Sequence, residues 1–149
     1  MGGEIAGPLV RIGGLIAFVL GVFEVVKGLL LLALVQAAGR LLSGAWLLSS
    51  IFPELGWLLS LVPVSGAALA AAHIVAGAVY AAAARSLIKV PVPMPPEKRD
   101  KWTTALAVLA AVAIILNLHG LLLALGLSLA GLLLGAAEAT QQSAETRPS

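Results

Sequence analysis

Three long apolar stretches, at about residues 9–37, 65–87 and 102–137, constrain the fold more than any other feature of this sequence. A helix needs about 20 predominantly apolar residues to cross a bilayer, and each stretch reaches that length. Hydrophobic residues make up 60% of the chain and charged residues 11%, whereas a soluble domain carries about 25% charged residues. The sequence therefore predicts an all-α integral membrane protein.

The third stretch is too long for a single span. As one helix it would extend about 54 Å at 1.5 Å per residue, against a bilayer core of about 30 Å. The sequence Asn117-Leu118-His119-Gly120 interrupts it, so we expect a tight hairpin of two short spans, at about 102–117 and 120–137. With the stretches at 9–37 and 65–87, these make a polytopic bundle of four transmembrane helices.

The segment 40–63 is long enough to cross a membrane, yet it is interrupted. Pro53 and Glu54 lie at its centre, with Trp46 and Trp57 on either side. Proline removes a backbone donor and breaks a helix, and tryptophan favours the headgroup level. We expect two short helical pieces in an interfacial or re-entrant position between the first and second spans. A fifth span is the alternative.

A basic, proline-rich loop at residues 88–101 separates the second and third spans. Four spans with the N-terminus inside place seven basic residues in the cytoplasm and one outside, and five spans give the same ratio. The positive-inside rule therefore predicts a multi-pass protein of the cell membrane whose loop 88–101 and polar C-terminal tail 138–149 are cytoplasmic. The side of the N-terminus stays open. Candidate contacts for lipid headgroups or a partner are Lys89, Lys98, Arg99 and Lys101.

Two charged residues, Glu24 and Lys27, lie inside the first apolar stretch. Apolar side chains around them favour membrane insertion by roughly 5–10 kcal/mol, and each central charge costs about 2.5–3.5 kcal/mol. The helix can therefore insert with both charges. Their i, i+3 spacing places them within reach of each other. They form either an ion pair that fixes helix register or part of a proton or ion relay, and the sequence leaves both readings open.

Small residues at helical spacing mark the faces where these helices pack, because they let another helix approach closely. The first stripe contains Glu24 as well, so we expect that carboxylate to point into a helix contact and not into lipid. The packing residues are Ala17, Gly21 and Gly28 in the first span and Ala124, Ser128, Gly131 and Gly135 in the last.

His73 and Tyr80 are the polar side chains of the second span that could face Glu24. Haem ligation by His73 would require a second axial ligand at similar depth, and His119 is expected at the outer surface. Neither histidine has a carboxylate four residues away. We therefore expect no metal site and no cofactor.

The sequence carries no recognisable catalytic motif. It has no cysteine, which excludes thiol catalysis and disulfides, and it lacks nucleophile-elbow, phosphate-loop and zinc-protease motifs. The basic residues cluster in one loop without interleaved aromatic residues, so nucleic acid is not an expected partner. We expect a protein that is not an enzyme.

The segments FEVVKGLLLLALV, GAVYAAAARSL and RDKWTTAL together resemble an uncharacterised family of small bacterial and archaeal membrane proteins, a domain of unknown function. The resemblance rests on Phe23, Glu24, Lys27 and Gly28, on Tyr80 and Ala81, and on Lys101 and Trp102. It covers about a third of the chain. It implies four spans in a bacterial or archaeal protein and no established activity.

Two functions follow from these expectations. The first is a structural or accessory subunit that works in the bilayer by helix packing, as a homo-oligomer or within a larger membrane complex. The alternative is a small transporter or a proton- or ion-conducting protein that uses Glu24, Lys27 and His73.

Overall fold

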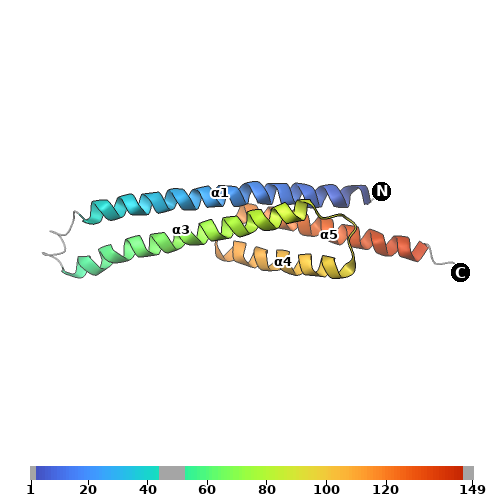
Figure 1. Ribbon diagram of the computed structural model, residues 1–149. Helices are drawn as coiled ribbons and strands as arrows, with labels where there is room; N and C mark the ends of the chain where they lie inside the picture. The colour runs from blue at the N-terminus through green and yellow to red at the C-terminus, as the bar shows by residue number, and fades with distance from the viewer. Residues whose placement is uncertain (1–2, 44–52, 146–149) are drawn as a thin grey trace. The chain divides into compact units, whose positions relative to one another are not determined.

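The computed structural model of this chain describes residues 3–43 and 53–145, and the long elements in these ranges are helices. They are α1 (Gly3–Ser43), α3 (Pro53–Ile88), α4 (Pro96–Ile115) and α5 (His119–Glu145), shown in Figure 1. Within the described ranges there is no β-strand. The predicted all-α class is confirmed.

Three of the helices are long and apolar enough to cross a membrane, as expected of a membrane protein. The qualifying segments are Ile5–Leu41 in α1, Pro63–Ile88 in α3 and His119–Gln141 in α5. The helix α4 does not qualify, because five of its first six residues are charged, at positions 97–101. The fourth span predicted from the sequence therefore stays a prediction.

The segment 40–63 differs from its expected form of two short separate pieces. Its first residues complete α1, and residues 44–52 lie outside the described ranges. Pro53 begins α3, which continues through Pro63 to Ile88 without a break. Proline is tolerated at a helix start, because its missing N–H would have no helical partner there. The second helix therefore begins 12 residues before the expected Ser65. The interfacial position of this segment stays a prediction.

The hairpin between α4 and α5 is closed by a helix-terminating turn at Asn117. This residue adopts φ 59°, a left-handed conformation that asparagine tolerates better than most residues. The Asn117 N–H donates to the Ile114 carbonyl at 3.0 Å, and the Leu118 N–H donates to the Ala113 carbonyl at 2.7 Å. This pair of bonds is the Schellman motif, which satisfies the last carbonyls of a helix. The turn lies within the Asn117–Gly120 interruption recognised in the sequence.

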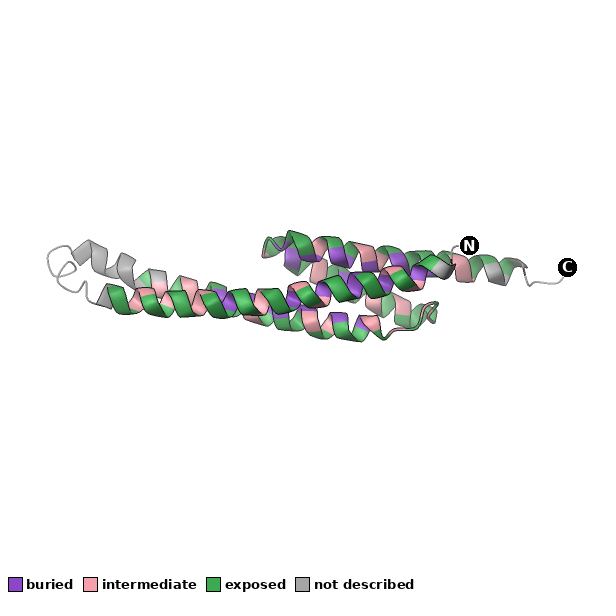
Figure 2. Cartoon of the chain, turned by 90° about the horizontal axis from the view of Figure 1, so that it is seen from above, coloured by how far each residue is buried: buried purple, intermediate pink, exposed green. Residues whose placement is uncertain are grey.

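The chain divides into two compact units, which are described separately. Unit 1 contains residues 1–21 and 79–149, and unit 2 contains residues 22–78. The long helices α1 and α3 contribute to both units. In unit 1, α4 and α5 lie side by side in both views (Figures 1 and 2).

The core of unit 1 depends on a close contact between α1 and α5. A Cβ added at Gly131 would lie 2.9 Å from the Ala6 carbonyl oxygen and 2.8 Å from Cγ2 of Val10, and one at Gly13 would collide with Oγ of Ser128. Such distances leave no room for a side chain, so glycine is what allows the two backbones to approach. The predicted packing residues of the last span, Ala124, Ser128, Gly131 and Gly135, are all buried.

Large apolar side chains cover the outside of the helices. Leu123 in α5 is 78% exposed and Leu34 in α1 is 67% exposed, and exposed residues recur along each helix in Figure 2. Monomeric soluble proteins seldom expose apolar patches of more than a few hundred Å². Such a surface suits hydrocarbon, where apolar side chains are favourable.

The contact at Gly131 yields a prediction with a matched control in the same helix. We expect Gly131→Ala to lower the free energy of unfolding by about 1–3 kcal/mol, because the added methyl group overpacks the contact with α1. At Gly126 no atom beyond the adjoining residues and the local backbone of α5 lies within 4 Å of an added Cβ. We therefore expect Gly126→Ala to be neutral or to stabilise α5 by up to about 1 kcal/mol through helix propensity.

Denaturant titration of both variants in mixed micelles, followed by far-UV circular dichroism, measures the difference. Equal stability of the two alanine variants would show that α5 does not approach α1 closely at Gly131.

Candidate functional site

The candidate site is a cluster of three polar side chains in unit 2, contributed by two helices. Glu24 and Lys27 lie one turn apart on α1, and His73 lies on α3. The Glu24 Oε2 atom is 2.8 Å from Nδ1 of His73 and 3.5 Å from Nζ of Lys27. One carboxylate oxygen therefore connects both helices and both basic side chains. We call these residues the Glu24 cluster.

The three side chains differ in their exposure. Exposed fractions are 8% for the His73 side chain, 13% for the Glu24 side chain and 48% for the Lys27 side chain. The contact between Glu24 and His73 is thus shielded by protein, whereas half of the Lys27 side chain lies on the surface of α1. The cluster therefore connects a shielded hydrogen bond between Glu24 and His73 to the half-exposed ammonium group of Lys27.

Small residues beside the cluster allow this geometry. A Cβ added at Gly28 would lie 2.8 Å from the Ala70 carbonyl oxygen and 2.7 Å from Cγ1 of Ile74. Gly28 follows Glu24 by one turn of α1, and Ala70 precedes His73 by nearly one turn of α3. The backbones therefore meet next to the two polar residues, and short side chains there bring a carboxylate and an imidazole into hydrogen-bonding range.

In the hydrogen bond between Glu24 and His73, either the carboxyl oxygen or the Nδ1 atom must carry the shared proton. An ionised carboxylate can only accept, so the Nδ1–H of His73 donates to it when Glu24 is charged. With a neutral imidazole and the Lys27 ammonium, the cluster has no net charge. Neutrality matters because an unpaired charge in hydrocarbon costs about 2.5–3.5 kcal/mol on the insertion scale.

The position of the cluster along the helices places it within the membrane wherever α1 and α3 cross. The apolar segment of α1 is 37 residues long and that of α3 is 26. Any span of about 20 residues chosen within Ile5–Leu41 includes Glu24, and any such span within Pro63–Ile88 includes His73. If both helices cross a membrane, the hydrogen bond between Glu24 and His73 therefore lies within the apolar spans or at their edge.

Tyr80, the other predicted partner on the second span, has a different role. It belongs to unit 1, where it is among the largest fully buried side chains. Its hydroxyl donates to the Leu109 carbonyl oxygen at 2.5 Å, so it connects α3 to α4. The structure brings His73 to Glu24 and gives Tyr80 a structural hydrogen bond within the bundle.

The predicted packing residues of the first span are all buried. Ala17 and Gly21 belong to unit 1, and Gly28 packs against α3 in unit 2. Sequence reasoning missed Gly13 and Gly14, which also pack closely: a Cβ at Gly14 would lie 2.9 Å from Cγ1 of Ile88. The sequence pattern could have indicated both glycines. Gly13 precedes Ala17 by four residues, and Gly14 precedes Gly21 by seven, as Gly21 precedes Gly28.

The four predicted basic residues of the loop lie between the end of α3 and the first turns of α4. Lys89, Lys98 and Lys101 line a common cavity. Arg99 is not part of the cavity lining and pairs with an acidic residue instead: its Nε atom is 3.5 Å from Oδ1 of Asp100. In the described ranges, no group of three or more His, Asp or Glu side chains is arranged to hold a metal ion.

Comparison of the chain with protein-family models, curated proteins and solved structures found no match. The resemblance of the Phe23–Gly28 and Tyr80–Ala81 segments to a family of small membrane proteins stays a prediction.

The hydrogen bond of the Glu24 cluster yields a spectroscopic prediction. The chain has two histidines, so ¹⁵N-histidine labelling of a His119→Gln protein leaves His73 as the sole labelled imidazole. We expect Glu24→Gln to move the Nδ1 resonance of His73, because a neutral amide replaces the charged acceptor.

Glu97→Gln is the control for this measurement, because Glu97 is exposed in the first turn of α4. That change should leave the His73 spectrum unaltered. An Nδ1 resonance that stays in place when Glu24→Gln is introduced would show that the hydrogen bond does not form.

Proposed function

We propose that the protein is a non-enzymatic subunit of a membrane assembly, held to its partner through the face of α1 that carries Lys27. In this proposal α1, α3, α4 and α5 are four spans, with residues 40–63 at the interface and the loop 88–101 in the cytoplasm. The observation that carries the proposal is the position of Lys27, a half-exposed cation among apolar side chains within a candidate span.

The surroundings of Lys27 support a protein partner. Lys27 lines a shallow apolar groove of about 280 Å³ on the outside of α1, together with Phe23, Val26, Leu30, Leu31 and Leu34. Its ammonium group has three donors, and within the described residues its acceptor is the Glu24 carboxylate at 3.5 Å, which also accepts from His73. Polar side chains in hydrocarbon favour interhelical hydrogen bonds. A partner helix with a carboxylate or a carbonyl oxygen would accept the remaining hydrogen bonds of the Lys27 ammonium group.

The small-residue stripes do not supply this interface. The space beside Gly28 is filled by residues of α3. The space beside Gly131 is filled by residues of α1, and the space beside Gly135 by other residues of unit 1. A bulky substitution at Gly28 would therefore test the fold of the chain itself. The groove beside Lys27 supplies the assembly surface in this proposal, whether the partner is a second copy or another membrane protein.

Site-specific photocrosslinking tests the assembly. We expect a photoreactive residue in place of Leu30 to give a discrete protein adduct in native membranes, and Lys27→Met to abolish it, because the apolar side chain cannot bond to the partner. Gel mobility and mass spectrometry of the adduct identify either a second copy or a different chain.

Leu123 provides the matched control, because it is a highly exposed leucine on α5. Crosslinks from that position should reach lipid only. Lipid adducts alone from both positions, or an adduct at Leu30 that persists in Lys27→Met, would refute the proposed interface.

The alternative function is proton or ion conduction, and the hydrogen bond between Glu24 and His73 favours it. Carboxylate and imidazole are the usual groups of intramembrane proton relays, and here they lie 2.8 Å apart on two candidate spans. Such a pair can accept and release a proton without breaking the helix contact.

Proteoliposomes with an imposed pH gradient test this alternative. If the Glu24 cluster conducts, Glu24→Gln and His73→Phe should each remove the flux, whereas His119→Gln should retain it, because His119 begins α5 outside the cluster. Absence of flux in the unchanged protein, or an unchanged flux in Glu24→Gln, would eliminate conduction through this cluster.

A further inference from the structure

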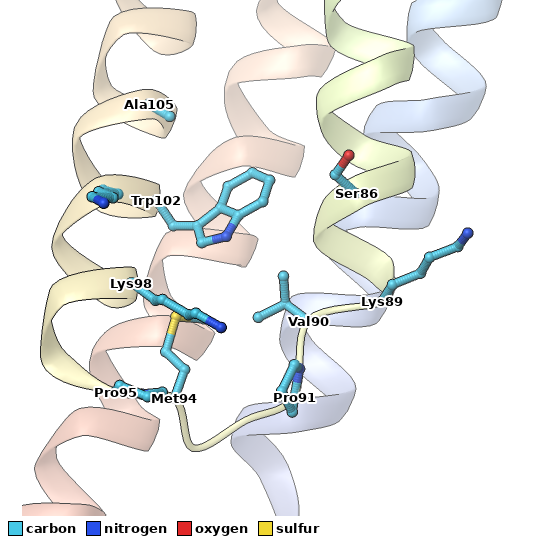
Figure 3. Close-up of a pocket in the computed structure, with 10 residues that line it drawn as sticks. Ser86, Lys89, Val90, Pro91, Met94, Pro95, Lys98, Trp102 and Ala105 are labelled. Carbon is cyan, nitrogen blue, oxygen red and sulfur yellow. The ribbon is translucent and has the colours of Figure 1, made fainter.

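A second polar feature lies in unit 1, where α3 ends and α4 begins. A cavity of about 610 Å³ opens there, within the size range of sites for small molecules. Its lining consists of Ser86, Lys89, Val90, Pro91, Met94, Pro95, Lys98, Lys101, Trp102 and Ala105. Figure 3 shows the Trp102 indole extending from α4 toward α3, with Lys98 and Met94 beside it.

The chemistry of the lining is divided between cations and apolar groups. Three lysines contribute ammonium groups, and Val90, Met94 and Trp102 contribute apolar surface. No acidic side chain lines the cavity. Within the described part of the chain, none of the three lysines lies within 4 Å of a carboxylate oxygen. The cavity therefore presents uncompensated positive charge next to an apolar wall.

The level of the cavity matches the boundary of a bilayer. The apolar segment of α3 ends at Ile88, and Lys89 is the next residue. The apolar part of α4 begins at Trp102, directly after Lys101. Tryptophan is enriched at the headgroup level, and lysine extends its ammonium group toward headgroups while its stem stays in apolar surroundings.

The wall of the cavity is held by contacts outside it. Val92 packs against α5, since a Cβ added at Gly135 would lie 2.7 Å from its Cγ1. The Val90 N–H donates to the Leu87 carbonyl at 3.1 Å, and the Arg99 N–H donates to the Pro95 carbonyl at 3.0 Å. Prolines in the segment restrict its backbone further. The backbone that carries the lysines is thus held in place by hydrogen bonds and by packing against α5.

We propose that this cavity binds the phosphate headgroup of an anionic phospholipid, with the lysines around the phosphate and Trp102 against the start of the acyl chains. A free phosphate ion has the same charge chemistry, but it would make no use of the apolar wall formed by Met94 and Trp102. A phospholipid uses both parts of the lining. The site is independent of the Glu24 cluster, so it does not rest on the proposed assembly.

Fluorescence of Trp102 tests the site directly. The chain has three tryptophans, so Trp46→Phe with Trp57→Phe leaves Trp102 as the sole emitter. In proteoliposomes, we expect phosphatidylglycerol with brominated acyl chains to quench Trp102 more strongly than the same fraction of brominated phosphatidylcholine. Lys98→Gln with Lys101→Gln should weaken the preference about tenfold or more, because each lysine near the surface attracts anionic lipid.

Two control variants distinguish a built site from general surface charge. Arg85→Gln removes an exposed cation of α3 outside the cavity lining, and it should leave the preference intact. Lys98→Arg with Lys101→Arg retains the charge and should keep most of the preference, which separates loss of binding from loss of folding.

A third arm distinguishes the two sources of phosphate. Inorganic phosphate added to vesicles of phosphatidylcholine alone should not alter Trp102 emission. A response to free phosphate without any preference for phosphatidylglycerol would overturn the lipid proposal. Equal quenching by the two brominated lipids, or an equal loss in Arg85→Gln and the double lysine variant, would overturn it as well.

Discussion

Close approach of helix backbones at small residues is the interaction on which the rest of this structure depends. Within a bilayer, lipid is as apolar as a leucine side chain, so helices associate through close packing and hydrogen bonds. Gly28 allows α1 to meet α3, and Gly131 allows α5 to meet α1. The polar contacts follow from these approaches, because a carboxylate on one helix reaches an imidazole on another at 2.8 Å when the backbones nearly touch. A glycine one turn from Glu24 therefore contributes to the site as directly as the charged residue does.

Much of this arrangement could be predicted from residue spacing. Side chains three or four positions apart share a helix face, so the stripe containing Gly21 and Gly28 indicated the direction of Glu24. The break between α4 and α5 was visible because Asn117 tolerates the left-handed conformation that ends a helix. Pro53 was misleading, because proline disrupts a helix interior and is accepted at a helix start, and local sequence does not distinguish the two contexts. The choice of His73 over Tyr80 depended on tertiary contacts: Tyr80 bonds to the Leu109 carbonyl, an acceptor on a helix that spacing within α3 cannot reveal.

Two sets of polar side chains among the described residues have different surroundings. Glu24 and His73 satisfy each other inside protein, which keeps charge away from hydrocarbon. The lysines that line the cavity have no carboxylate partners among the described residues, and they stand where an apolar segment gives way to a polar one. Internal pairing suits the first group, because water is absent there to solvate a lone charge. In the proposed membrane position, the second group can remain unpaired within the protein, because headgroups and water would meet it at that level.

The length of α1 has a consequence for how the protein sits in different membranes. Its apolar segment of 37 residues extends about 55 Å at 1.5 Å per residue, nearly twice the thickness of a typical hydrocarbon core. Such a helix meets a thicker or thinner bilayer by changing its tilt, at a modest cost for each ångström of mismatch. If α1 spans a bilayer, the thickness of that bilayer alone does not fix the depth of α1, and Lys89 after α3 and Trp102 in α4 would then act as the depth anchors of the molecule. If α1 spans a membrane, a chain built in this way keeps its apolar surface covered in bilayers of unequal thickness.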